Sequence, residues 1–209
     1  GAELYAGGGR GNVYQIVGDR SGKLKTRTVG NLGGRQVTAL LAADVIPWSP
    51  GVELLGFTDP GALWLFTEVE GGYEPLLVQE LDGAVLGTCV LPAREDEAPE
   101  IVTASRDGRL EIVQWTDSGP KWRGVHRLPV GMGPLACSTE ESEDSTVIYN
   151  ACGDGTIWRH VAGRADDWKH EMIYAGPRGP RGIALGRFRE EGGGRDAVSL
   201  MATSRRAIG

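Results

Sequence analysis

Short apolar runs alternate with polar or glycine-rich breaks along this chain, and the alternation recurs at a nearly constant interval. Five segments begin with an apolar run, break after it and start a second apolar run ten residues in: 3–13, 53–63, 100–110, 147–157 and 198–208. Four of the breaks contain a glycine, and the fifth has arginine in that slot: Gly11, Gly61, Gly108, Gly155 and Arg206. These positions are 50, 47, 47 and 51 residues apart, so the chain is a tandem repeat.

Each repeat contains further short apolar segments at matching distances. One set precedes the breaks, at 37–44, 84–91, 133–138 and 182–188, and another begins with an aromatic residue, at 73–81, 122–128 and 168–174. Short segments rich in β-branched and aromatic residues favour strands over helices. Asp107-Gly108 and Asp154-Gly155 are typical of hairpin turns, which need a positive φ that glycine adopts readily. A helix over 164–175, which lacks Gly and Pro, is the alternative for the last segment.

Four-stranded units of 47–51 residues predict an all-β protein, a β-propeller whose sheets pack against one another as blades. One blade alone leaves both faces of its sheet uncovered, so neighbouring blades have to cover them. We predict blades at about 18–70, 71–116 and 117–162, with partial blades at 1–17 and 163–209. Because both ends of the chain fall inside a blade, residues 1–209 form either one propeller domain with an irregular seam or an incomplete ring. In the second case the chain is a fragment of a larger propeller, and the remainder of that propeller is a partner.

The charge and hydrophobicity of the chain narrow the classes of partner. The 22 basic and 28 acidic residues give a net charge of −6, which argues against a nucleic-acid binder that tracks phosphates. No apolar run approaches the roughly 20 residues of a membrane span, so we expect no membrane insertion.

Four segments resemble known propeller repeats. Residues 182–204, GIALGRFREEGGGRDAVSLMATS, resemble the FG-GAP or VCBS repeat of integrin-like propellers, in which two apolar strands flank a loop rich in Asp and Gly. Residues 101–115 resemble the third and fourth strands of a WD40 repeat. The segments PGALWLF (60–66) and GDGTIWRH (153–160) are similar to tandem-repeat propeller lectins. The lectin-like resemblance implies glycan recognition and the WD40-like one implies a protein-interaction scaffold. FG-GAP-like and lectin-like proteins are commonly exported, so the resemblance favours an extracellular or exported location.

Metal and cofactor chemistry is not expected. FG-GAP loops that hold calcium use alternating Asp or Asn, because Ca²⁺ takes six to eight oxygen ligands. The matching loop here, 187–192, has arginine in its first and third slots. No histidine makes a short metal-ligand spacing with another histidine or with cysteine, and we expect His126 and His170 to be ordinary solvated or half-buried strand residues.

The three cysteines cannot form a complete disulfide framework. Cys89 and Cys137 lie 19 and 18 residues before their turn glycines, and this shared offset predicts a small core residue at both positions. Cys152 belongs to the strand expected beside that of Cys137, so a Cys137–Cys152 disulfide within one blade is left open.

The candidate binding residues follow the turns. Three positions after each turn glycine the chain has an aromatic residue in three repeats and glutamate in the other: Tyr14, Trp64, Trp158 and Glu111. Aromatic faces stack on sugars and flat ligands, and polar turn side chains could bind hydroxyl groups: Arg10, Asn12, Arg106, Asp107, Arg109, Asp154 and Thr156. The alternative is that the aromatic rings pack between blades.

We find no catalytic constellation in the sequence. The favoured function is a non-enzymatic propeller that recognises a glycan or glycosylated partner at one rim. One alternative is a protein–protein interaction scaffold within a larger assembly. A second is a propeller enzyme such as a lyase, with catalytic residues that the sequence does not reveal, because one fold hosts all three functions.

Overall fold

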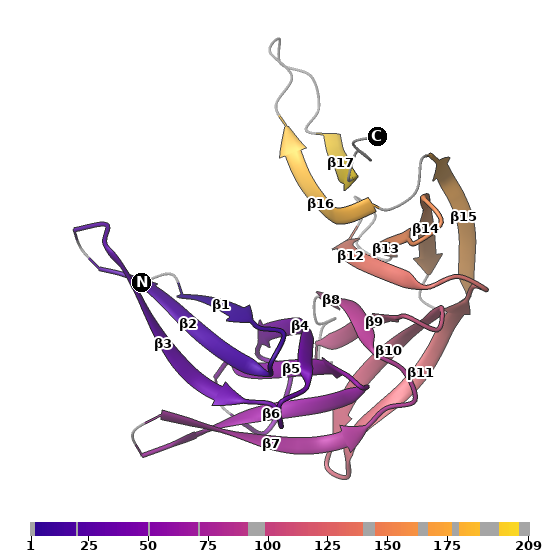
Figure 1. The fold of residues 1–209 in the computed structure, drawn as a ribbon. Helices are drawn as coiled ribbons and strands as arrows, with labels where there is room; N and C mark the ends of the chain where they lie inside the picture. The colour runs from indigo at the N-terminus through magenta and orange to yellow at the C-terminus, as the bar shows by residue number, and fades with distance from the viewer. Residues whose placement is uncertain are drawn as a thin grey trace. The chain divides into compact units, whose positions relative to one another are not determined.

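The computed structural model describes residues 3–19, 21–49, 51–70, 72–91, 99–139, 145–162, 167–176, 180–188 and 197–204, and every regular element in these ranges is a β-strand (Figure 1). The predicted all-β class is therefore confirmed. Trp168–Ala175 is strand β15, which decides against the alternative helix in that part of the chain.

Most strands belong to sheets whose strand order is the chain order. The first sheet has three strands: β1 (Glu3–Gly7), β2 (Asn12–Gly18) and β3 (Leu24–Asn31). The second has four: β4 (Gln36–Ala43), β5 (Glu53–Asp59), β6 (Ala62–Val69) and β7 (Gly72–Glu80). The third has four: β8 (Val85–Leu91), β9 (Glu100–Ser105), β10 (Arg109–Thr116) and β11 (Gly119–Arg127).

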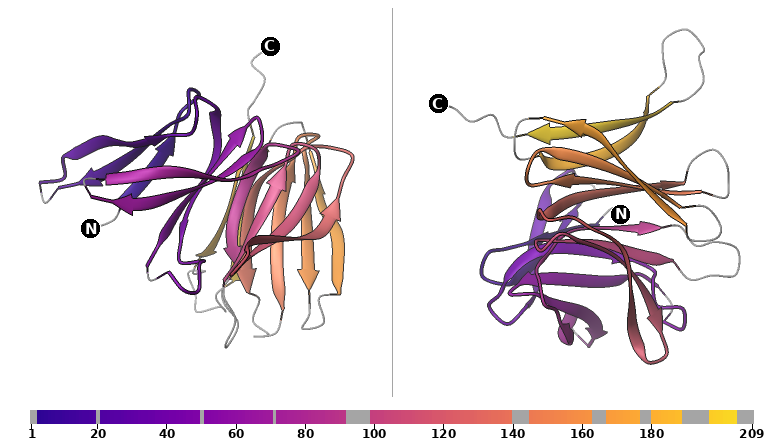
Figure 2. Two further views of the ribbon diagram at one scale, coloured as in Figure 1. Left: turned by 90° about the horizontal axis from the view of Figure 1, so that it is seen from below. Right: turned by 90° about the vertical axis from the view of Figure 1, so that its right-hand side faces the viewer.

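The remaining strands continue the pattern. The fourth sheet has four strands: β12 (Met132–Thr139), β13 (Thr146–Cys152), β14 (Thr156–Ala162) and β15. A two-stranded sheet follows: β16 (Pro180–Phe188) and β17 (Ala197–Ser204). Antiparallel sheets of four strands in chain order (Figure 2) resemble the blades of a propeller,.

The hydrogen-bonded sheets begin one strand later than the predicted repeat limits. Each aromatic-start segment pairs with the strand before it, as Trp64 of β6 with Leu77 of β7 and Ala162 of β14 with Trp168 of β15. The sheets therefore cover 36–80, 85–127 and 132–175. The predicted blade limits and the single-domain organisation stay predictions.

One backbone hydrogen bond recurs in four successive repeats. The carbonyl of each turn glycine accepts a hydrogen bond from a backbone N–H 20 or 21 residues further on, at or just beyond the end of the following strand. The pairs are Gly11 with Leu32, Gly61 with Leu81, Gly108 with Leu128, and Gly155 with Gly176, at 2.9, 3.0, 2.9 and 3.2 Å. This bond ties the turn before the second-to-last strand of a sheet to the residue just beyond its last strand.

The chain forms two compact units. The first unit comprises 1–86 and 115–121. Its core lies between the first two sheets, where β1 lies beside β4 and β3 beside β7. The buried side chains at its centre are Val13, Val29, Leu32, Leu54 and Phe66.

The second unit comprises 87–114 and 122–209. In it β9 lies beside β12, and β12 beside β16. Its core contains Leu91, Val102, Ala104, Leu110, Ile112, Met132, Leu135, Ile148 and Cys152. The first strands of two sheets approach closely here, since a Cβ on Gly87 would lie 2.2 Å from the carbonyl oxygen of Gly133.

A disulfide joins β8 to β12 within the second unit. It links Cys89 to Cys137, with a Cα–Cα distance of 6.1 Å, inside the range that a disulfide spans. The Cys137–Cys152 pairing left open by the sequence is wrong, because Cys137 lies opposite Ile148 in the β12–β13 register while Cys152 lies opposite Met132. Cys152 is a buried free thiol whose sulfur accepts a hydrogen bond from Asn150 Nδ2 at 3.2 Å.

No helix in the described ranges is long and apolar enough to cross a membrane.

Candidate functional site

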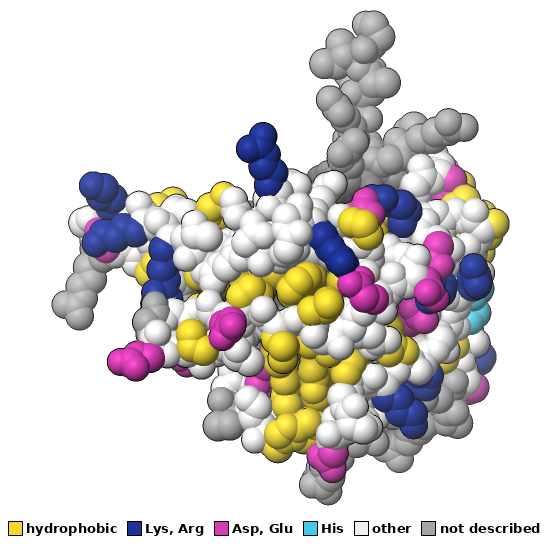
Figure 3. All heavy atoms as spheres, turned by 60° about the horizontal axis from the view of Figure 1, so that its bottom comes forward, with side chains coloured by type: hydrophobic (Ala, Val, Ile, Leu, Met, Phe, Trp, Pro, Cys, Tyr) yellow, Lys and Arg dark blue, Asp and Glu magenta, His cyan; other side chains and the backbone are white. Residues whose placement is uncertain are grey.

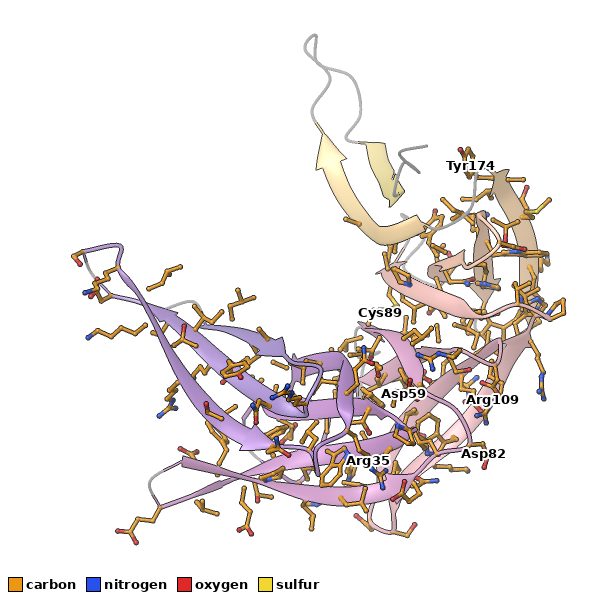
Figure 4. All side chains as sticks on the ribbon, in the orientation of Figure 1. Arg35, Asp59, Asp82, Cys89, Arg109 and Tyr174 are labelled. Carbon is orange, nitrogen blue, oxygen red and sulfur yellow. A yellow bond between two sulfur atoms is a disulfide. The ribbon has the colours of Figure 1, made fainter. Side chains whose placement is uncertain are left out.

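The polar side chains of the predicted turn site are engaged in local hydrogen bonds. The Asp107 carboxylate accepts hydrogen bonds from Ser105 Oγ and, at 2.7 Å, from Arg109 Nε (Figure 4 labels Arg109). Partial burial opposes ionisation of Asp107, but these hydrogen bonds and the charge of Arg109 outweigh it, so its pKa is lowered. Asp154 Oδ1 accepts hydrogen bonds from the Thr156 backbone N–H and hydroxyl at 3.0 and 2.8 Å. These carboxylates thus brace their own turns.

The predicted aromatic residues pack largely on the cores. Trp64 packs against the core of the first unit, and Trp158 against that of the second, with its indole N–H donating to Thr156 Oγ1 at 3.1 Å. Tyr14 is half-buried, and its hydroxyl accepts a hydrogen bond from Asn12 Nδ2 at 3.2 Å. Tyr14 and Trp64 belong to the first unit and Trp158 to the second.

Three residues of the predicted turn site remain. Arg10 and Arg106 are exposed, and Glu111, which replaces the aromatic residue in its repeat, lies 3.7 Å from Arg109 Nη1. A ligand-binding role for the predicted site residues stays a prediction.

The three histidines, which the sequence analysis did not connect, lie close together in the structure: His126 on β11, His160 on β14 and His170 on β15. The His126 ring stacks on the His170 ring, with centroids 4.0 Å apart and planes 24° from parallel. The His160 ring lies 5.4 Å from His126 and 5.1 Å from His170. His160 is completely buried, His126 is half-buried and His170 is exposed. We call these three side chains the histidine cluster.

A chain of hydrogen bonds fixes the proton positions in the cluster. His160 Nε2 lies 2.6 Å from Asn150 Oδ1. The Asn150 amide nitrogen donates to Cys152 Sγ, so its oxygen faces the ring and Nε2 has to carry the proton,. His160 Nδ1 is then an acceptor, and His170 Nδ1, 2.9 Å away, donates to it. In this arrangement His160 is the neutral Nε2–H tautomer and His170 donates through Nδ1.

Burial keeps the cluster uncharged near neutral pH. It lowers the pKa of His160 to about 3, with smaller contributions from the positive charges that His170 and His126 would carry. Burial and then the charge of His170 lower the pKa of His126, and burial lowers that of His170. His126 Nε2 is buried and has no hydrogen-bond partner among the described residues.

The cluster is not arranged around a common point. His126 and His170 stack face to face, and the facing nitrogens of His160 and His170 bond to each other. Among the described residues, no group of three or more His, Cys, Asp or Glu side chains is placed to hold a metal ion. The expected half-buried and solvated environments of His126 and His170 agree with their exposures, but their proximity to His160 was missed. The available signal was that His126 and His170 lie on equivalent aromatic-start segments of successive repeats.

Exposed apolar side chains form a second feature, on the last strands of two sheets. Met172, Ile173 and Tyr174 on β15 are 50%, 40% and 52% exposed. Leu76 and Leu77 on β7 of the first unit are also exposed. Figure 3 shows hydrophobic side chains at the surface among acidic and basic ones, and Figure 4 labels Tyr174 at the C-terminal end of β15.

Comparison with known proteins gives a fold-level similarity. No protein-family model matches the chain, and no curated protein sequence matches it. Among solved structures, the crystal structure of BBS1N in complex with ARL6DN, soaked with lead, is similar over 98% of this chain and 78% of that chain. The identity is 11% and the TM-score is 0.47. The chain is assigned to no family.

Proposed function

We propose that this chain is a non-catalytic, protein-binding propeller module that contacts a partner protein through the exposed apolar end of β15. The observation that carries the proposal is the run of three consecutive exposed apolar residues, Met172, Ile173 and Tyr174, on a strand that ends its sheet. Exposed apolar side chains that are grouped mark interaction sites, whereas single ones are ordinary, and these three are grouped at one end of an edge strand,.

The two halves of β15 differ in a way that supports this function. The first half carries Lys169 and Glu171, and Glu171 lies 4.0 Å from Arg159 of β14. Charged side chains on an edge strand discourage pairing with another chain. The second half, 172–175, carries no charge. An edge strand with charged side chains along one half and apolar side chains along the other favours binding to a specific partner over nonspecific association.

The carbohydrate hypothesis gains no comparable support. The carboxylates of Asp107 and Asp154, which would bind sugar hydroxyls, accept hydrogen bonds from their own turns. The indole of Trp158 lies against a core, so its contact area is partly used. The protein-interaction alternative therefore replaces glycan binding as the favoured function.

Site-directed crosslinking tests the proposal. A photo-reactive amino acid at Tyr174 should give one dominant protein adduct in a native extract, and the same probe at Leu24, 69% exposed on β3, should not. The double variant Met172→Lys, Ile173→Lys should bind the captured protein at least tenfold more weakly, because loss of interface anchors costs more than about 1.4 kcal/mol. Lys169→Glu on the same strand is the matched control. Equal adducts from both probe positions, or a glycan-array signal without any protein adduct, would contradict the proposal.

A further inference from the structure

The histidine cluster lies where two neighbouring sheets of the second unit meet. His126 comes from β11, the last strand of one sheet, while His160 and His170 come from β14 and β15 of the next. We propose that the cluster is a pH-sensitive clasp, which holds β11 against β14 and β15 while its rings are neutral and releases β11 when the rings take up protons. This goes beyond the binding function proposed above and does not depend on it.

The contacts of His160 suit a neutral ring, which donates through Nε2 to Asn150 and accepts through Nδ1 from His170. A second proton on His160 would lie on Nδ1, directly against the His170 N–H at 2.9 Å, and two donors cannot share that contact,. Protonation of both stacked rings, His126 and His170, would place two positive charges on rings whose centroids lie 4.0 Å apart, and their repulsion loosens β11.

In the described strands around the cluster, no carboxylate faces the rings to stabilise their protonated form. The four strands that contribute to it or pack on it, β11, β13, β14 and β15, contain one carboxylate, Glu171. Neighbouring residues in a strand point to opposite faces of the sheet, so Glu171 and its partner Arg159 face away from His160 and His170.

The other charged groups on these strands are cations. They are Lys121, Arg123 and Arg127 on β11 and Lys169 on β15, and Arg123 is held 3.2 Å from Glu100 of β9. The remaining titratable group on the inner side is the Cys152 thiol, whose pKa is raised by burial, so it stays neutral. By the same alternation these four cations face away from His126 and His170, so a positive charge on the cluster meets neutral and apolar groups,.

The direction of the pH effect follows from the lowered pKa values. The three histidines hold fewer protons in the folded than in the unfolded state, where the ordinary pKa is 6.5. The unfolding free energy that these three histidines contribute is fully present above pH 6.5 and is lost as the pH falls below that value. For His160 the loss continues down to its folded pKa of about 3. Below pH 6.5, each histidine that can be protonated only when β11 has separated from β14 and β15 lowers the equilibrium constant for the closed state about tenfold per pH unit.

Nuclear magnetic resonance offers a direct test, because the chain has only three histidines and all belong to the cluster. Every imidazole signal in the intact protein therefore reports on the clasp. We expect all three to titrate below pH 6.5, and the amide protection factors of β11, β14 and β15, which correct for the intrinsic exchange rate, to fall as the pH is lowered from 7.5 to 5. The strands β4–β6 of the first unit, which carry no histidine, serve as the internal control. Titration near 6.5 with unchanged amide protection would overturn the proposal.

Variants separate the clasp from general acid sensitivity. His126→Phe keeps a ring to stack on His170 but cannot be protonated, so protection of β11 should fall less steeply with pH, by about tenfold per pH unit. Lys169→Gln, a change of charge on the opposite face of β15, should leave the pH profile unchanged. His160→Gln risks unfolding, and His126→Phe keeps the proposal testable in that case. A folded His126→Phe variant with the unaltered pH profile would refute the clasp.

Discussion

Removal of the Cys89–Cys137 disulfide gives the most quantitative prediction. The bridge joins residues 48 positions apart, and both lie in the second unit. In the chain-entropy model, a crosslink lowers the entropy of the unfolded chain by about 2.1 + 1.5R ln n cal/mol/K. With n of 48 this is roughly 14 cal/mol/K, or about 4 kcal/mol at 25 °C,. The double variant Cys89→Ser, Cys137→Ser should therefore lose about 2–4 kcal/mol of unfolding free energy.

Urea unfolding of four samples measures this loss. The oxidised wild type should unfold at a higher urea concentration than the wild type treated with a reducing agent, and the double variant should match the reduced wild type. The reducing agent should have no effect on the double variant, because Cys152 is a free thiol. Identical midpoints for oxidised and reduced wild type would refute the reasoning, as would mass spectrometry that finds Cys89 and Cys137 unlinked in the oxidised protein.

Two further predictions concern packing in the second unit. Gly108→Ala should destabilise the protein by about 1–3 kcal/mol, because Gly108 has φ of +83° and an added Cβ would lie 2.0 Å from the Leu128 carbonyl oxygen; Gly124→Ala, with open space around it, is the control in thermal unfolding. Leu110→Ala should cost about 2–5 kcal/mol by leaving a cavity in the core,. Leu76→Ala at an exposed site should change the unfolding free energy by less than about 0.5 kcal/mol,, and a similar loss in both leucine variants would contradict the burial of Leu110.

The strands and turns were predictable because they depend on local sequence. Three of the turn glycines, Gly11, Gly108 and Gly155, have the positive φ that hairpin turns require, at 80°, 83° and 96°. Gly61 differs, because it has no positive φ and is needed for space: a Cβ there would lie 2.5 Å from the Gly83 carbonyl oxygen. Its spacing placed it in the repeat, but only the packing explains why it is glycine.

Contacts between sheets were not predictable in the same way. Cys89 and Cys137 were recognised as equivalent positions, yet the sequence does not reveal that such positions on successive first strands face each other across 6.1 Å. The histidine cluster needs two facts of this kind, the β14–β15 register that pairs His160 with His170 and the packing of β11 on that pair. Spacing along the chain carries neither fact, so the three residues looked unrelated.

The backbone bond from each turn glycine to the end of the last strand has a consequence for how such a chain can grow. Both of its atoms come from one stretch of about 21 residues, and neither is a side-chain atom. A duplicated gene segment would thus keep this hydrogen bond as long as the turn glycine is retained. Later copies are free to diverge in their side chains, as the disulfide and the histidines show by occurring in some copies and not in others.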